Sequence, residues 1–155
     1  MEIIRNVQEQ SGELKGEFFW GFYDKWISVS CIEGNHLEEA VQCANYLNNL
    51  PGNVIEDALK ASIRYRNDFL LSEELPLSLD NPRGVLPLIL PLDLWVLEPD
   101  RGKYPYVLLE WDCEWEVEHG MIWVIRDDSV VYVGAANAAP DPWEDLADYE
   151  EGNYA

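Results

Sequence analysis

Residues 110–118 of the chain read EWDCEWEVE, a strict alternation of acidic and apolar residues. Successive side chains of a β-strand point to opposite faces of a sheet, so this two-residue period predicts a strand with one wet face and one buried face. We predict a strand over residues 104–117. Its buried face would carry Trp111, Cys113, Trp115 and Val117, and its wet face would carry Glu110, Asp112, Glu114, Glu116 and Glu118.

The five acids of the wet face, Glu110, Asp112, Glu114, Glu116 and Glu118, are the main candidate binding residues, and we call them the acidic strip. Neighbouring carboxylates on one strand face stand about 7 Å apart, where their repulsion in water is about 0.6 kcal/mol before salt screens it. The strip is therefore stable as a solvated face without any partner. The alternatives are a basic protein surface or divalent cations bound along it. Calcium needs roughly six to eight oxygen ligands, so the strip alone forms no metal site, and we predict no metal and no cofactor.

A candidate functional corner follows the strip at His119 and Gly120. A histidine flanked by acids can act as a general base. No nucleophile elbow, phosphate-binding loop or metalloprotease motif accompanies it, so an enzyme is not the favoured interpretation. The simpler interpretation is a hairpin turn in which Gly120 adopts a positive φ.

Three antiparallel strands are predicted for the C-terminal half of the chain. The strand over 104–117 is followed by strands over 121–126 and 129–134, with Asp127 and Asp128 as the second turn. Near the N-terminus, the aromatic and β-branched residues of 18–32 flank a short polar break and predict a hairpin.

Two amphipathic helices are predicted between these strand regions. Asn35 and Asn53 each precede a glutamate by three residues, which is typical of a helix N-terminus. Pro51 and Gly52 separate the two helices, and this predicts an αα-hairpin. Five prolines in residues 72–100 exclude a long helix there. Residues 86–97 are too apolar for a free linker, so we expect an edge segment that leads into a short strand near 92–97, with an exposed interface segment as the alternative.

The predicted fold class is therefore α+β. An antiparallel sheet, made of the N-terminal hairpin and the C-terminal three-stranded meander, packs against the αα-hairpin. Residues 1–140 are predicted to form a single globular domain, and residues 141–155 a mobile acidic tail, with docking of its first turn through Trp143 and Leu146 as the alternative.

The composition favours some partners and excludes others. The chain has 30 acidic and 10 basic residues, a formal charge of −20, which disfavours nucleic acid and anionic membranes and favours a basic protein partner. Solubility alone is the other explanation of this charge. A content of 48% apolar residues excludes a disordered chain. Three widely spaced cysteines, the absence of a signal peptide and the absence of a long apolar run predict reduced core thiols and a cytoplasmic location.

Residues 113–120, CEWEVEHG, resemble the C-x-W-[DE]-x-E-H-G strand corner of a family of bacterial α+β domains of unknown function. Phe18-Phe19-Trp20-Gly21 and Ala44-Asn45-Tyr46-Leu47 extend the resemblance towards the N-terminus. It implies an α+β fold and no activity. Domains of this kind often look like immunity proteins of bacterial toxin systems, which is an association only.

These observations predict an acidic cytosolic binding protein. Its specific form would be an immunity-type inhibitor that neutralises a basic toxin or nuclease through the acidic strip. The alternatives are an enzyme or divalent-metal protein that uses His119 with neighbouring carboxylates, and a domain whose acidity serves solubility only.

Overall fold

A computed structural model describes residues 3–32, 36–70, 73–97 and 104–155 of the chain. The strands form one seven-stranded sheet in the order of the sequence, β1 to β7. The strands are β1 (Ile4–Gln10), β2 (Glu13–Trp20), β3 (Lys25–Cys31), β4 (Ile89–Val96), β5 (Val107–Cys113), β6 (Met121–Arg126) and β7 (Ser129–Ala135). The helices are α1 (Leu37–Asn48) and α2 (Gly52–Asp68), with short 3-10 helices η1 (Pro82–Leu88), η3 (Ala136–Ala138) and η4 (Leu146–Tyr149).

The prediction of an α+β fold is confirmed, and the sheet is larger than predicted. All neighbouring strands are antiparallel except β3 and β4, which are parallel. The prediction of an edge segment before a short strand near 92–97 is wrong, because β4 begins at Ile89 and lies in the middle of the sheet. The sheet accommodates Pro91 because the β4–β5 pairing shifts register between Pro91 and Asp93, where the missing proline N–H breaks no regular ladder.

The strand that carries the acidic strip is shorter than predicted. β5 ends at Cys113, and residues 114–119 form turns. The reason is the length of its neighbours: Cys113 pairs with Ile89, the first residue of β4, and Trp111 pairs with Met121, the first residue of β6. Beyond Cys113 neither side offers a strand to hydrogen-bond with, so the two-residue alternation continues in sequence without a sheet to support it.

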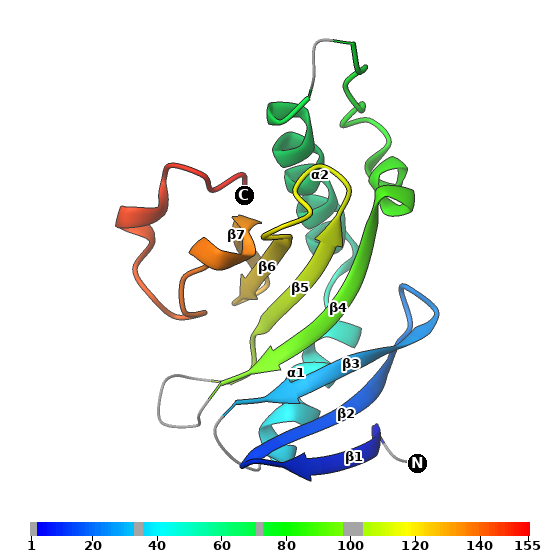
Figure 1. The fold of residues 1–155 in the computed structure, drawn as a ribbon, viewed down its shortest axis with the longest axis vertical. Helices are drawn as coiled ribbons and strands as arrows, with labels where there is room; N and C mark the ends of the chain where they lie inside the picture. The colour runs from blue at the N-terminus through cyan, green and yellow to red at the C-terminus, as the bar shows by residue number, and fades with distance from the viewer. Residues whose placement is uncertain (1–2, 33–35, 71–72, 98–103) are drawn as a thin grey trace.

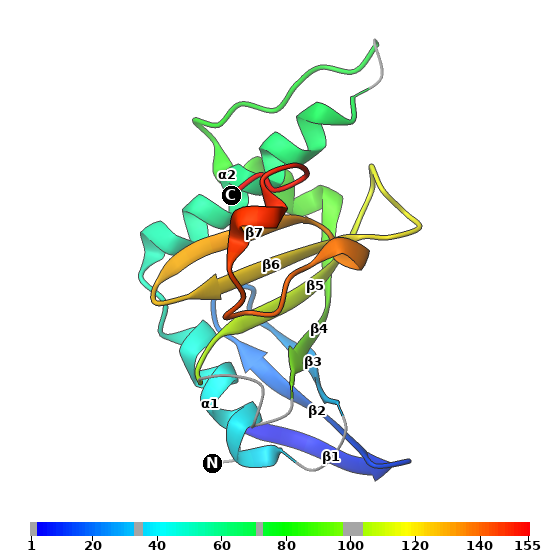
Figure 2. The same cartoon turned by 90° about the vertical axis from the view of Figure 1, so that its left-hand side faces the viewer.

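The two predicted helices are present but do not form the predicted αα-hairpin. α1 packs on β2 to β5, whereas α2 packs on β7 and η1, so the helices follow one another along one face of the sheet (Figure 2). Asn53 is not the N-cap of α2, because Pro51 occupies that position with φ −57°. The ψ of 143° leaves Pro51 outside the helix, where its missing N–H breaks no intrahelical hydrogen bond. Asn35 lies outside the described residues.

A cluster of three fully buried indole rings lies between the helices and the sheet. The rings of Trp20, Trp111 and Trp123 lie 4.6 to 6.3 Å from one another. Trp123 Nε1 donates to Ser62 Oγ at 2.8 Å, and this hydroxyl donates in turn to the Ala58 carbonyl at 2.8 Å. The cluster thus links β2, β5 and β6 to α2. Of its three indole N–H groups, only that of Trp123 is hydrogen-bonded, because Trp20 Nε1 and Trp111 Nε1 are buried without a partner.

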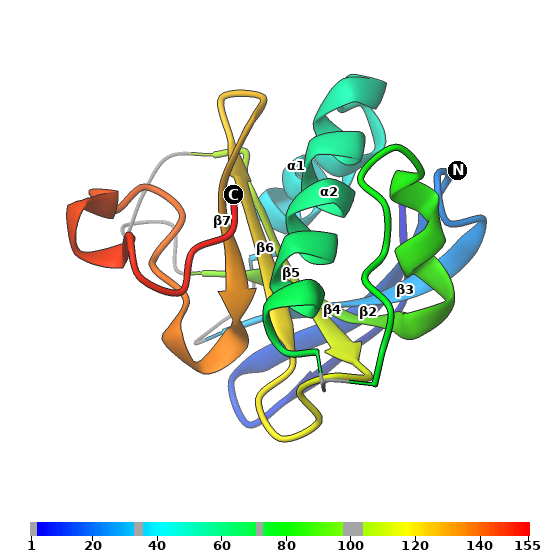
Figure 3. The same cartoon turned by 90° about the horizontal axis from the view of Figure 1, so that it is seen from above.

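The C-terminal tail lies against the domain, where the sequence predicted a mobile segment. Figure 3 shows β6 and β7 between the tail on one side and α2 on the other. Arg126 Nη1 donates to the carbonyl oxygens of Pro142 and Glu144, at 2.6 and 3.0 Å. Further along, Tyr154 N donates to Val133 O at 2.8 Å, so the tail also covers part of the β7 edge.

None of the helices in the described part of the chain is long and apolar enough to cross a membrane.

Candidate partner-binding site

The face of β2 to β5 that points away from the helices is the principal candidate site, and we call it the open face. Figure 1 looks onto this face, with α1 behind the strands and the tail beside them. Along each strand the residues that alternate with the core positions lie on it. Its side chains include the carboxylates of Asp93, Glu110 and Asp112 and the apolar groups of Phe19, Trp26 and Leu90.

Two carboxylates face each other across the β4–β5 ladder. Asp93 and Glu110 are direct cross-strand partners, an arrangement that like charges disfavour. Ser30 Oγ donates to the Asp93 carboxylate at 2.9 Å, and Trp95 Nε1 donates to Glu110 Oε1 at 2.9 Å. Burial raises the pKa of Asp93 to about 6, against the opposing effects of the Ser30 hydrogen bond and of Lys15. The open face therefore holds a pair of acids whose mutual repulsion costs free energy at the β4–β5 ladder.

Apolar side chains are exposed beside these acids. The rings of Phe19 and Trp26 pack edge to face at 5.8 Å, and the Arg5 guanidinium lies 3.7 Å from the centre of the Trp26 ring. Phe19 is 39% exposed, and Leu90, the cross-strand partner of Asp112, is 52% exposed. Exposed aromatic and aliphatic groups among polar residues are typical of protein–protein interfaces.

The acidic strip is divided by the end of β5. Glu110 and Asp112 lie on the open face, as the alternation predicted, whereas Glu114, Glu116 and Glu118 lie in the β5–β6 turn and form no ladder with them. Val117, predicted to be buried, is 76% exposed. The arrangement of the strip as one strand face is thus wrong beyond Cys113, and its role in partner binding stays a prediction.

The corner at His119 and Gly120 is a turn. Gly120 has φ +67°, which confirms the predicted positive φ, and its N–H donates to Glu116 O at 2.9 Å. His119 Nδ1 lies 3.4 Å from Glu116 Oε1, and the His119 side chain is 43% exposed. His119 lines none of three cavities that the described residues form, and the enzyme hypothesis stays a prediction.

Other site chemistries have little basis in the part of the chain that the structure describes. It contains no group of three or more His, Cys, Asp or Glu side chains placed to hold a metal ion. Cys31, Cys43 and Cys113 are free and buried, and burial raises their pKa values to about 11, 12 and 11. Thiols of this kind are protonated and unreactive at neutral pH.

Sequence reasoning missed Asp93 and the aromatic pair as site residues. Asp93 is the single acid in the otherwise apolar run of residues 92–97, and an acid in such a run is a signal of a special environment. Phe19 carried no such signal, because only the pairing of β2 with β3 shows that it faces away from the core.

We expect Asp93→Asn to raise the free energy of unfolding by about 1–2 kcal/mol at neutral pH, after allowance for partial exposure of the carboxyl. The folded-state pKa of about 6 exceeds the reference value of 3.8, so stability linked to this group is fully present below about pH 3.8 and is lost as pH rises through 6. Asparagine avoids this loss and still accepts from Ser30. Urea unfolding at neutral pH and at about pH 5 checks the prediction. The increase in the free energy of unfolding caused by Asp93→Asn should fall by roughly half at the lower pH. An increase that is larger at the lower pH contradicts the account.

Comparison with known proteins identifies one family. The model of a domain of unknown function, DUF6985, matches residues 4–140, a range that includes the open face and the β5–β6 turn. No curated protein and no solved structure matches the chain. The predicted resemblance to a domain family of unknown function is thus confirmed, whereas bacterial origin and kinship with immunity proteins stay predictions.

Proposed function

Because the chain belongs to the DUF6985 family of domains of unknown function, we propose its function from the geometry of the open face: the domain is a non-enzymatic, cytosolic binding module that binds a basic protein partner there. The observation that carries the proposal is the combination, on one uncovered sheet face, of Asp93, Glu110 and Asp112 with exposed Phe19 and Leu90.

The charge of the chain supports a basic partner. A formal charge of −20 attracts positively charged surfaces over long range and repels nucleic acid. A cation placed at the open face would add to the effect of Lys15 and further offset the repulsion between Asp93 and Glu110. Electrostatic attraction of this kind sets association rate and specificity more than affinity.

The exposed apolar groups support a protein partner rather than a simple cation. Binding energy at interfaces concentrates in a few buried aromatic and aliphatic contacts, and Trp26, already held by Phe19 and Arg5, is a pre-ordered anchor of this type. An immunity-type inhibitor is one such binding module. Its acidic face would occupy the phosphate-binding cleft of a basic toxin or nuclease.

A displayed library of short peptides rich in Lys and Arg, with scattered apolar positions, tests the proposal. Peptides that the wild-type domain enriches should bind Glu110→Lys/Asp112→Lys at least about tenfold more weakly. Glu56→Lys/Asp57→Lys is the matched control, because it makes the same change in net charge at exposed positions of α2. Circular dichroism verifies that both variants are folded.

The outcome for the control decides between a site and a general charge effect. Loss of binding in the open-face variant alone supports the proposal. Equal loss in both variants means that the acidity acts only through net charge, and no enriched peptide means that the open face is no basic-peptide site; either result overturns the proposal.

A further inference from the structure

A cavity of about 360 Å³ lies away from the open face, between the C-terminal end of α2 and the β5–β6 turn. It is lined by Arg66, Phe69, Glu74, Leu88, Glu114 and Trp115. Its volume is in the range of small-molecule sites, roughly 300–1,000 Å³. Its lining combines one guanidinium, two carboxylates and apolar walls, so a specific ligand chemistry can be derived from it.

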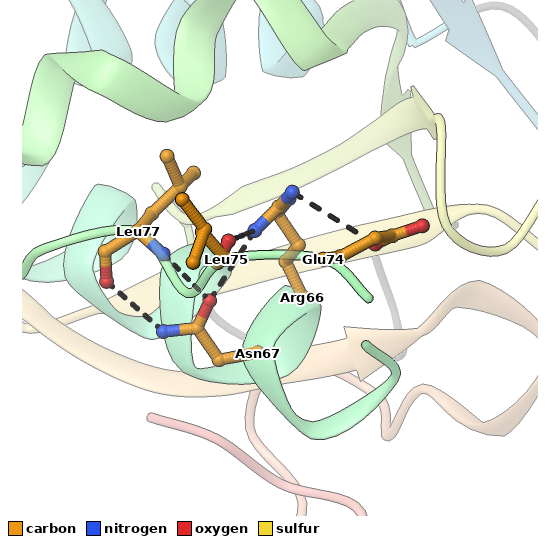
Figure 4. A network of polar contacts seen from close by, with 5 residues as sticks. All are labelled: Arg66, Asn67, Glu74, Leu75 and Leu77. Carbon is orange, nitrogen blue, oxygen red and sulfur yellow. Dashed lines mark hydrogen bonds and ion pairs between the residues drawn. The ribbon is translucent and has the colours of Figure 1, made fainter. Parts of the chain in front are cut away.

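The guanidinium of Arg66 is sheltered and only loosely bound. Its side chain is 15% exposed. Its contacts, drawn in Figure 4, are a hydrogen bond of 3.3 Å to Leu75 O, one of 3.5 Å to Asn67 Oδ1, and an ion pair of 4.0 Å with Glu74. A guanidinium has five N–H donors, and these long contacts leave capacity for a planar anion such as a carboxylate.

The wall of the cavity beside this arginine is anchored to α2 by Asn67. Asn67 Nδ2 donates to Leu77 O and Asn67 Oδ1 accepts from Leu77 N, both at 3.0 Å. Figure 4 shows this pair of bonds beside the guanidinium. The segment that carries Glu74 and Leu75 is thereby held against α2, so the cavity wall is pre-organised rather than formed by the ligand.

Arg66 and the two carboxylates together disfavour ligands of a single charge sign. An anion bound to Arg66 would lie near Glu74 and Glu114, and a cation bound to these two acids would lie near Arg66. A ligand with a carboxylate and an ammonium group satisfies all three side chains at once. The cavity therefore favours a zwitterion over either ion alone.

The remaining walls are apolar and packed. The Tyr65 ring meets the Phe69 ring edge to face at 5.2 Å and the Trp115 ring at 5.6 Å, which fixes both lining aromatics. Leu88 completes this wall. An apolar body attached to the zwitterionic head would be buried against these rings.

We propose that this cavity binds a small zwitterion of the α-amino acid class with an apolar side chain. Its carboxylate binds to Arg66, its ammonium group lies beside Glu74 and Glu114, and its side chain packs against Phe69 and Trp115. This site is separate from the open face and does not depend on partner binding there.

Calorimetric titration with L-phenylalanine, L-leucine and L-methionine tests the proposal, each beside its N-acetyl acid and its amide. At least one amino acid should bind saturably, with its two singly charged derivatives about tenfold weaker or worse. The Trp115 indole N–H resonance should shift in the same titration. No saturable binding by any of the three, or equal binding by an amino acid and its derivatives, overturns the proposal.

Arg66→Gln should weaken binding about tenfold or more, whereas Arg64→Gln should not. Arg64 lies on the same helix, but its Nε donates to Tyr154 O at 2.9 Å outside this cavity. Should Arg66→Gln fail to fold, Glu114→Gln replaces it, because Glu114 is exposed in the turn. This variant should lower the affinity for the amino acid and for its amide, which both carry the ammonium group, and leave that for the N-acetyl acid unchanged. Unchanged affinity in the folded variant contradicts the assignment.

Discussion

Trp111→Ala is expected to destabilise the domain by about 3–5 kcal/mol, a large fraction of the total stability of a domain of this size. Trp111 is fully buried, and its ring lies 4.6 Å from that of Trp123 and 5.8 Å from that of Trp20. Truncation leaves a cavity in a cluster that joins three strands to α2. Urea unfolding, followed by far-ultraviolet circular dichroism, measures the loss.

Val117→Ala is the control for this experiment. The two-residue alternation placed Val117 on the same buried face as Trp111, but the structure leaves it 76% exposed in a turn. Its truncation should change the free energy of unfolding by about 0.5 kcal/mol or less. A loss well above this value would mean that the strand continues beyond Cys113 and that the described turn is wrong.

Gly120→Ala is expected to cost about 2–4 kcal/mol, from two effects that add. Gly120 has φ +67°, a left-handed conformation that costs an L-residue about 1–2 kcal/mol. A Cβ at this position would also lie 2.6 Å from the Trp111 carbonyl oxygen, which is backbone and cannot move aside without disturbing the β5–β6 ladder. Equilibrium unfolding in urea measures the total.

Gly12→Ala separates these two effects. Gly12 has φ +78° in the β1–β2 turn, and a Cβ there meets nothing within 4 Å. Its alanine variant should therefore show the conformational cost alone, about 1 kcal/mol. Equal losses at the two glycines would show that the close approach to Trp111 does not matter, and the corner would then be an ordinary turn.

The parts of the fold that the sequence predicted best depend on local patterns. The strand Met121–Arg126 has the predicted bounds, and the turn after it uses Asp127 and Asp128 at φ 49° and 55°, the left-handed pair that a tight hairpin requires. Both the apolar run and the turn chemistry are contained in a few consecutive residues. The two helices were recognised for the same reason, from their three- and four-residue apolar spacing.

The parts that the sequence did not predict depend on pairing between distant segments. The sequence predicts an edge segment that leads into a short strand near 92–97, and only the pairing of β4 with β3 and β5 shows that this strand lies inside the sheet and how the sheet tolerates Pro91. The predicted strand that carries the acidic strip is wrong beyond Cys113. A strand needs neighbouring strands to pair with, and the neighbours of β5 start only at Ile89 and Met121. Alternation alone could not show where those partners begin.

The candidate site was predictable only where its residues lie within one strand. Glu110 and Asp112 follow from the alternation within β5 and are on the open face. Asp93 joins them only through the β4–β5 register, and Ser30 reaches Asp93 from β3, 63 residues away in sequence. The aromatic pair of Phe19 and Trp26 lies in the predicted hairpin, but which of its residues are exposed depends on where the helices pack.

The most direct test of the open face as a partner site is a nuclear magnetic resonance titration. The ¹⁵N-labelled domain is titrated with a basic peptide that the displayed library enriches, and the backbone amide shifts are mapped onto the sheet. The account predicts that the largest shifts lie in β2 to β5, around Phe19, Trp26, Asp93 and Glu110, and that they diminish as salt is added. Shifts centred on α1, α2 or the C-terminal tail, with the open face unchanged, would contradict it.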